Sequence, residues 1–229
     1  MNQVVLHEDT HLLVVHKPAG IATQTNRIGE VDLVSQMKNY VKGNYIGVIN
    51  RLDQQVEGIV LFAKTQEAAR LLSRQMQENQ MQKQYKALVV GIPKTRETLV
   101  HYLRKEQKGN RSCVVEQGTQ DSKKASLSYQ TIQQYEGLLT KERISLLSVY
   151  LETGRHHQIR VQFAHEEIPI IGDFKYGNDV SKEISCQLKI EGIALCAVGL
   201  MCIHPIQKKK IEWNVEPNWM KLTEKLHCI

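Results

Sequence analysis

The chain lacks paired cysteines. Its five cysteines are odd in number, and no two of them are spaced as Cys-x-x-Cys. A disulfide framework uses an even set and structural zinc clusters use closely spaced pairs, so the pattern argues against both. The cysteines indicate a reducing compartment instead, and we expect the protein in the cytoplasm.

Long hydrophobic runs are also missing. The first nine residues contain no basic segment followed by an apolar core, so no secretory signal is expected. The longest apolar run, residues 193–203, is too short to cross a bilayer and contains Gly199. We expect a buried strand there and no membrane partner.

Nucleotide-binding motifs are absent from the sequence as well. It has neither Gly-x-Gly-x-x-Gly nor a Gly-Lys-Ser/Thr phosphate loop, so no NAD, FAD, ATP or GTP cofactor is expected. No linker, repeat or low-complexity segment interrupts the chain. Its 229 residues, 41% hydrophobic and 24% charged, therefore suit one globular domain over residues 1–229, or two packed subdomains.

What the chain does have is an excess of basic residues. It carries 30 Lys and Arg against 24 Asp and Glu, for a formal charge of +6 and a pI near 9.0. This balance favours a polyanionic partner, but charge alone does not separate nucleic acid from an acidic membrane surface.

Local patterns predict a chain dominated by strands. Residues 4–6 and 12–16 are β-prone and flank a polar turn, which predicts an opening hairpin. Apolar residues at helical spacing predict helices over 30–42, ended by Gly43, and over 65–80, capped by Thr65. Further strands are predicted at 85–91, 144–151 and 193–203, hairpins at 98–135, and helices at 155–166 and 217–226. Hairpins outnumber βαβ units, so the fold class is α+β with a mixed, mainly antiparallel sheet.

The segment 50–64 contains Arg51-Leu52-Asp53, in which one carboxylate stands between an arginine and a strongly apolar strand entered through Gly58. An aspartate in such a setting can be a nucleophile. Taken alone, Asp53 also has the pattern of a solvated turn residue.

Several ordered motifs together resemble the RluA-type RNA pseudouridine synthases over roughly residues 4 to 206. They are Arg51-Leu52-Asp53 followed by Tyr85-Lys86-Ala87, residues 151–161 with Gly172-Asp173 and Tyr176-Gly177, and Leu195-Cys196-Ala197 with His204-Pro205. Residues 12–20 are similar to the opening strand and turn of the family. An ordered set is more specific than any one of its members.

The resemblance implies the pseudouridine synthase fold, with a curved central sheet, few flanking helices and a basic cleft. It also implies a reaction in which the N1–C1′ bond of a uridine in RNA is broken and a C5–C1′ bond is made, without cofactor or metal. Asp53 is then the nucleophile, and Tyr85 stacks on the target base. Arg160 is our candidate for the cation that holds the carboxylate in place. Alternatively, Arg160 is a helix-surface arginine and Tyr85 a strand-packing residue.

Five residues are predicted to contact the RNA. No S4-type RNA-binding domain is expected, so the catalytic domain, expected to be a monomer, must find its RNA with its own surface. Basic side chains must offset the few kcal/mol that it costs to unstack the target base. The predicted contacts are Arg51, Arg155, His157, Lys123 and Lys124. The sequence does not decide between ribosomal and transfer RNA.

The chain also departs from the family pattern at specific positions. Asn50 stands where the family usually has histidine, Val56-Glu57 where it has a threonine-serine pair, and His156 where it more often has threonine. Glu57 thus adds a negative charge near the presumed RNA path. These changes keep open a rival function, an RNA-binding or RNA-folding protein with weak or lost catalysis.

A more distant rival is a metal hydrolase built on His156, His157 and Asp173. The spacing of His156, His157 and His165 is not that of the zinc helices, in which two histidines are four residues apart. We therefore expect no metal site.

Overall fold

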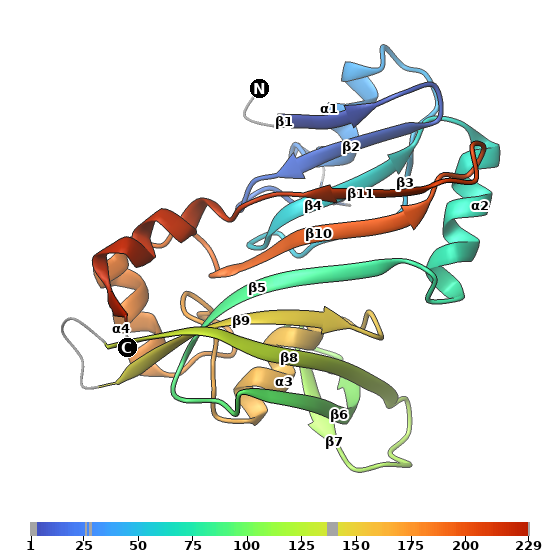
Figure 1. The fold of residues 1–229 in the computed structure, drawn as a ribbon. Coiled ribbons are helices and arrows are strands. Elements are labelled where there is room, and N and C mark those ends of the chain that lie inside the picture. Colours follow the sequence, from blue (N-terminus) through green and yellow to red (C-terminus); the bar gives the residue numbers. More distant parts are fainter. Residues whose placement is uncertain (1–3, 26, 28, 137–141, 229) are drawn as a thin grey trace. The chain divides into compact units, whose positions relative to one another are not determined.

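The computed structural model describes residues 4–25, 27, 29–136 and 142–228. The chain forms two compact units. Unit 1 comprises Met1–Lys83 and Cys196–Pro217, and unit 2 comprises Gln84–Leu195 and Asn218–Ile229. Both combine helices with mainly antiparallel strands, which confirms the predicted α+β class (Figure 1).

The strands of unit 1 follow the order β1, β2, β4, β10, and the pair β4–β10 is parallel while the others are antiparallel (Figure 1). The short β3 pairs with β4, and β11 pairs with β10. Their bounds are β1 Val4–Glu8, β2 Leu12–Lys17, β3 Gly47–Val48, β4 Glu57–Ala63, β10 Leu195–Ile203 and β11 Lys210–Asn214. The predicted opening hairpin is confirmed, whereas β11 was not predicted.

Asp9 closes the β1–β2 hairpin. Its Oδ1 accepts hydrogen bonds from the backbone N–H groups of His11 and Leu12, at 2.7 and 2.8 Å. Burial raises the pKa of Asp9, but these bonds, with those from the His7 and His204 rings, lower it more, to well below its ordinary value. The polar turn therefore favours the hairpin by giving its backbone donors a charged acceptor.

Two helices of unit 1 lie where helices were predicted, but the first is shorter at both ends than the predicted range 30–42. The helix α1 spans Leu33–Tyr40, with Asp32 as N-cap, and the N–H of Gly43 then bonds the carbonyl of Lys38 at φ +79°. The first left-handed residue after the helix is Lys42, with φ 54°, and Gly43 follows it. The helix α2 spans Gln66–Gln77, and the Thr65 hydroxyl accepts from the N–H of Ala68.

The core of unit 1 lies between β2, β4 and α2. Leu12 and Val14 of β2 pack with Leu61 of β4 and with Ala68 and Leu72 of α2, and all five are fully buried. Every second residue of the strands faces the apolar side of α2. The strand period of 2 residues and the helix period of 3.6 residues therefore bring apolar side chains into the same core.

The strands of unit 2 follow the order β5, β9, β8, β6, β7, all antiparallel, with β12 on β8 (Figure 1). They are β5 Gln82–Val90, which begins in unit 1, β6 Arg96–Lys105, β7 Ser112–Val115, β8 Lys123–Glu136, β9 Arg143–Leu151 and β12 His227–Cys228. The hairpins predicted over 98–135 are confirmed. Val161 of the helix α3, Gln158–His165, packs on Leu103 and Ala125 of this sheet.

Three helical segments of unit 2 differ from the prediction. The helix predicted over 155–166 begins only at Gln158, because His157 has left-handed backbone angles, with φ 54°. The segment predicted as a closing helix over 217–226 is a 3-10 helix, Asn218–Lys225, in which the Thr223 hydroxyl bonds the Met220 carbonyl. The helix α4, Asp179–Leu188, was not predicted.

No helix among the described residues is long and apolar enough to span a membrane. The apolar run over 193–203 forms β10, as predicted.

Candidate functional site

Asn50, the residue before Arg51-Leu52-Asp53, extends the pairing of β3 with β4 through its side chain. Its Nδ2 donates to the carbonyl of Ile59 at 3.0 Å, and its Oδ1 accepts from the N–H of Leu61 at 2.8 Å. A carboxamide offers a donor and an acceptor on one plane, as a peptide group does. Asn50 thereby anchors the chain to β4 just before the loop that carries Asp53.

The loop itself is held at alternate residues. The Thr23 hydroxyl donates to the carbonyl of Leu52 at 2.9 Å and accepts from its N–H at 3.1 Å. The carbonyl of Gln54 accepts from the N–H of Gly20 at 2.8 Å, and the Gln54 amide donates back to the Gly20 carbonyl. The residue between these two anchors is Asp53, which is half-buried, so its position in unit 1 is set by its neighbours.

Lys17 is a third anchor of the loop, and it was not among the predicted site residues. Its side chain is fully buried, and its ammonium donates to the carbonyls of Pro18, Ile21 and Gln54 at 2.9, 2.7 and 3.2 Å. Burial lowers its pKa to about 8, although the charge of Asp53, above all, acts to raise it. A lysine that lies just after the apolar run Leu12–Val15 and precedes a proline was the available signal.

We expect Lys17→Met to lower the rate of the reaction for which Asp53 is the predicted nucleophile by roughly 10- to 100-fold, because a buried cation near that carboxylate is removed. In the wild type the same charge is lost as pH rises through about 8, so activity should decline there.

The stability of the fold should change in the opposite direction. Between pH 8 and 10.5 Lys17 is more often protonated in the unfolded chain than in the folded one, so unfolding becomes less favourable as pH rises.

Rates and thermal unfolding, each followed from pH 7 to 10, check this expectation. Lys38→Met removes an exposed lysine of α1 and should leave both profiles unchanged. Equal rates for Lys17→Met and the wild type would contradict the role of Lys17, and the unfolding curves would show whether a slow variant is merely unfolded.

Glu57, which was expected to add a negative charge near an RNA path, is not exposed to solvent. It is buried at the start of β4, and its Oε2 lies 3.7 Å from Nε2 of His16. Burial and the charge of Lys17 lower the pKa of His16, so the imidazole is neutral at neutral pH. The negative charges of Asp53 and Glu57 both act to raise the pKa of the buried Lys17.

In unit 2, Arg160 is buried on α3 and forms a two-bonded ion pair with Asp173. Its Nε donates to Oδ2 at 2.7 Å and its Nη2 to Oδ1 at 2.8 Å. Asp173 Oδ1 also accepts from the backbone N–H groups of Lys175 and Tyr176. The planar guanidinium is thus fixed in orientation by a carboxylate that is itself held by the backbone. Arg160 is no helix-surface arginine.

Two adjacent histidines precede α3, and their rings stack at 3.7 Å between centroids. Nδ1 of His157 lies 2.8 Å from the Tyr176 hydroxyl, and His157 is 8% exposed. His156 lies 2.8 Å from the Ser112 hydroxyl and 3.1 Å from Oδ1 of Asn110. His156, where the family more often has threonine, therefore fastens the β6–β7 hairpin to the start of α3.

The remaining predicted RNA contacts are exposed, and three of them lie together in unit 2. Lys123 and Lys124 begin β8, and Nε of Arg155 donates to the Lys124 carbonyl at 2.9 Å. Arg51 is exposed in unit 1. Tyr85 is buried in β5, where it pairs with Val149 of β9.

Histidine, cysteine and carboxylate side chains with metal-ligand spacing form one group among the described residues, His101, His165 and Glu166. His156, His157 and Asp173, the set of the rival hydrolase, do not form such a group in that part of the chain. The ion pair with Arg160 and the hydrogen bond to Tyr176 engage Asp173 and His157 instead.

A sequence model of RNA pseudouridylate synthases matches residues 11–165, so the chain belongs to this family. This range includes Asp53, Tyr85 and Arg160.

Curated relatives bear related names. The chain is 31% identical over 215 residues to "Uncharacterized RNA pseudouridine synthase YhcT" of Bacillus subtilis, covering 90% of this chain and 66% of the relative. It is 32% identical over 213 residues to "Ribosomal large subunit pseudouridine synthase C" of Buchnera aphidicola, covering 90% and 65%. The chain thus spans slightly less than two thirds of both relatives. It is 29% identical over 238 residues to "tRNA pseudouridine synthase C" of Pasteurella multocida, covering 97% and 95%.

Among solved structures, "Human RNA Pseudouridylate Synthase Domain Containing 1" is similar with a TM-score of 0.78 and 22% identity, covering 100% of this chain and 89% of that one. The fold is therefore that of the pseudouridine synthases, as the resemblance implied.

Proposed function

We propose that the protein isomerises uridine to pseudouridine in structured RNA. The observation that carries the proposal is the anchored Asp53 loop: Asn50, Thr23 and Lys17 hold it from three sides, within the range that the family model matches. A nucleophile needs a fixed position, which this arrangement favours.

In the proposed reaction Asp53 attacks the target nucleotide, and the N1–C1′ bond breaks; the bond to Asp53 breaks again before the product leaves, which returns the free carboxylate. The uracil turns, the C5–C1′ bond forms, and C5 loses the proton that N1 gains. Atoms and electrons balance within the substrate, so no cofactor or metal takes part. Tyr85 stacks on the base. Arg160, oriented by Asp173, is proposed to hold the Asp53 carboxylate.

The proposed RNA contacts are of two kinds. Arg155, Lys123 and Lys124 form an exposed basic group that suits phosphates, as does the exposed Arg51. His157 is largely buried, so we propose that its contribution is to shape the start of α3. We propose that one domain acts as a monomer in the cytoplasm.

For the substrate class, we propose ribosomal or transfer RNA, because relatives of both names match most of this chain. The test is carbodiimide-dependent primer extension on RNA from cells with and without the gene. We expect at least one stop to disappear without the gene and to return with the wild-type gene. An unchanged set of stops in both RNA classes would overturn the proposal in favour of an RNA-binding protein without catalysis.

A further inference from the structure

Unit 2 contains a group of two histidines and one glutamate that the proposed reaction does not use. His101 lies on β6, His165 is the last residue of α3, and Glu166 is the residue that caps this helix. One ligand atom of each side chain can be chosen so that all three lie within 4.8 Å of one another. The fold thus brings together three potential metal ligands, of which His101 is far in sequence from the other two.

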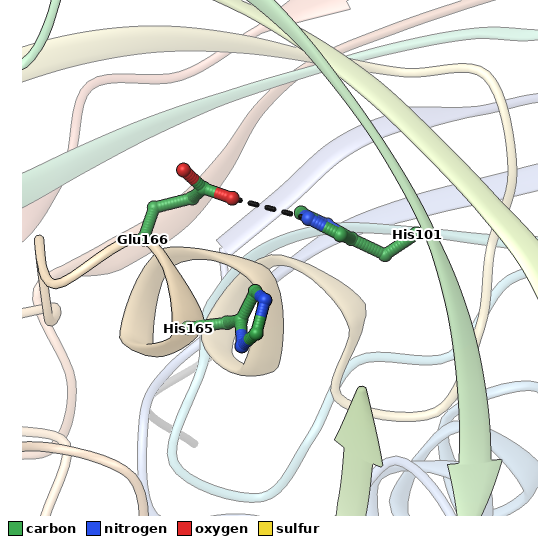
Figure 2. A group of neighbouring side chains, drawn as sticks. All are labelled: His101, His165 and Glu166. Atoms are coloured by element: carbon green, nitrogen blue, oxygen red, sulfur yellow. Dashed lines mark ion pairs between the residues drawn. The ribbon is translucent and has the colours of Figure 1, made fainter. Parts of the chain in front are cut away.

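The three side chains converge in space. Nε2 of His101 lies 3.1 Å from Oε1 of Glu166, and the His101 and His165 rings meet edge to face, with 5.0 Å between centroids. Figure 2 shows the His101 imidazole directed at the Glu166 carboxylate, with His165 beside it on the last turn of α3. His101 is partly buried, whereas His165 and Glu166 are exposed, so an ion can reach the group from solvent.

We propose that His101, His165 and Glu166 bind one divalent transition-metal ion of the zinc type. Two imidazole nitrogens and one carboxylate oxygen are a donor set that zinc, cobalt and nickel accept, and water can complete the coordination. Magnesium and calcium prefer sets made entirely of oxygen, so they are not expected to bind here.

Gln162 gives this group a supporting partner. It is fully buried, its Nε2 lies 3.0 Å from Nδ1 of His101, and its Oε1 has no hydrogen-bond partner. Half a turn of the Gln162 carboxamide exchanges its oxygen and nitrogen. The Gln162 oxygen then accepts from Nδ1–H of His101, and the lone pair of His101 Nε2 faces Glu166. A metal-bound imidazole needs such an acceptor. The turn also places the Gln162 oxygen opposite the Leu99 and Ala125 carbonyl oxygens, to which its Nε2 donates at 3.3 and 3.5 Å, and metal binding must offset this cost.

The position at the end of α3 also favours a cation. The carbonyl end of a helix carries partial negative charge, and His165 and Glu166 stand at that end. A bound ion would join β6 to α3, the helix that carries Arg160. We therefore assign the ion a structural role, in which it stabilises unit 2.

Metal titration of the full chain tests the site. Protein freed of metal with a chelator is titrated with CoCl2, followed by visible absorption, and with ZnCl2, followed by calorimetry. We expect uptake of one ion per chain into the His101 group, a higher unfolding temperature with zinc, and no effect of MgCl2. A band from sulfur ligation would assign the uptake to an exposed thiol such as Cys186 and would overturn the proposal.

Matched variants locate the ion. His165→Ala and Glu166→Gln change exposed side chains, so the fold should persist, and each should weaken binding by roughly 10-fold or more. His7→Ala, which removes a partly exposed histidine of β1 in unit 1, should bind as the wild type does. The proposal fails if the wild type takes up no ion, or if His165→Ala binds it equally well. Pseudouridine formation is measured separately and does not enter this test.

Discussion

Asp53→Ala is expected to make no detectable pseudouridine, a loss of more than roughly 10⁴-fold, because the variant lacks the proposed nucleophile. Its affinity for RNA should stay within a few fold of the wild type. The basic residues proposed to contact phosphates are unchanged, and the anchors of the loop are made by the backbone and by other side chains. Product formation and filter binding on the same RNA measure the two quantities.

Asp53→Asn provides the matched variant, because it keeps the size of the side chain while it removes the charge and replaces one acceptor oxygen by an NH2 donor. It should be as inactive as Asp53→Ala. Asp121→Asn, at an exposed turn residue, should be as active as the wild type. Undiminished product from either Asp53 variant would refute the mechanism. Both Asp53 variants also remove a negative charge beside the buried Lys17, so each should unfold at a somewhat lower temperature than the wild type.

Gly58→Ala is expected to have the largest effect on stability. Gly58 has φ +130° in β4 and lies opposite Ala197 of β10 in the parallel pair. An added Cβ would stand 2.5 Å from both the backbone N and O of Ala197, and neither atom can move without breaking the strand pairing. Overpacking and backbone strain together should cost roughly 3 kcal/mol or more, which corresponds to a fall of about 10 °C in unfolding temperature.

Gly43→Ala separates the effect of backbone strain from the effect of overpacking. Gly43 also has a positive φ, +79°, but a Cβ there meets nothing within 4 Å. It should therefore show strain alone, about 1 kcal/mol. Thermal unfolding of the two variants measures the difference. If Gly58→Ala proved as stable as Gly43→Ala, the close approach of β4 and β10 would not be a determinant of the fold.

Elements with strong local signals were predictable from the sequence. Thr65 caps the start of α2, and α1 ends just before the left-handed Lys42 and Gly43, because a cap and a left-handed terminus depend on neighbouring backbone groups alone. The helix α4 escaped prediction because its buried face includes Ser181 and Ser185, which hide the apolar stripe. His157 shortened α3 through its backbone angles, which no sequence period reveals.

By itself, then, the sequence determined the α+β class and the candidates Asp53, Tyr85 and Arg160, since motifs in order along a chain need no tertiary contacts to be recognised. Only the tertiary structure decided that Lys17 lies beside Asp53, that Glu57 is buried, that Asp173 orients Arg160, and that His101 meets His165. These outcomes depend on which strands pair and in what register. A period of two residues assigns each side chain to a face, but it does not name the partner on the neighbouring strand.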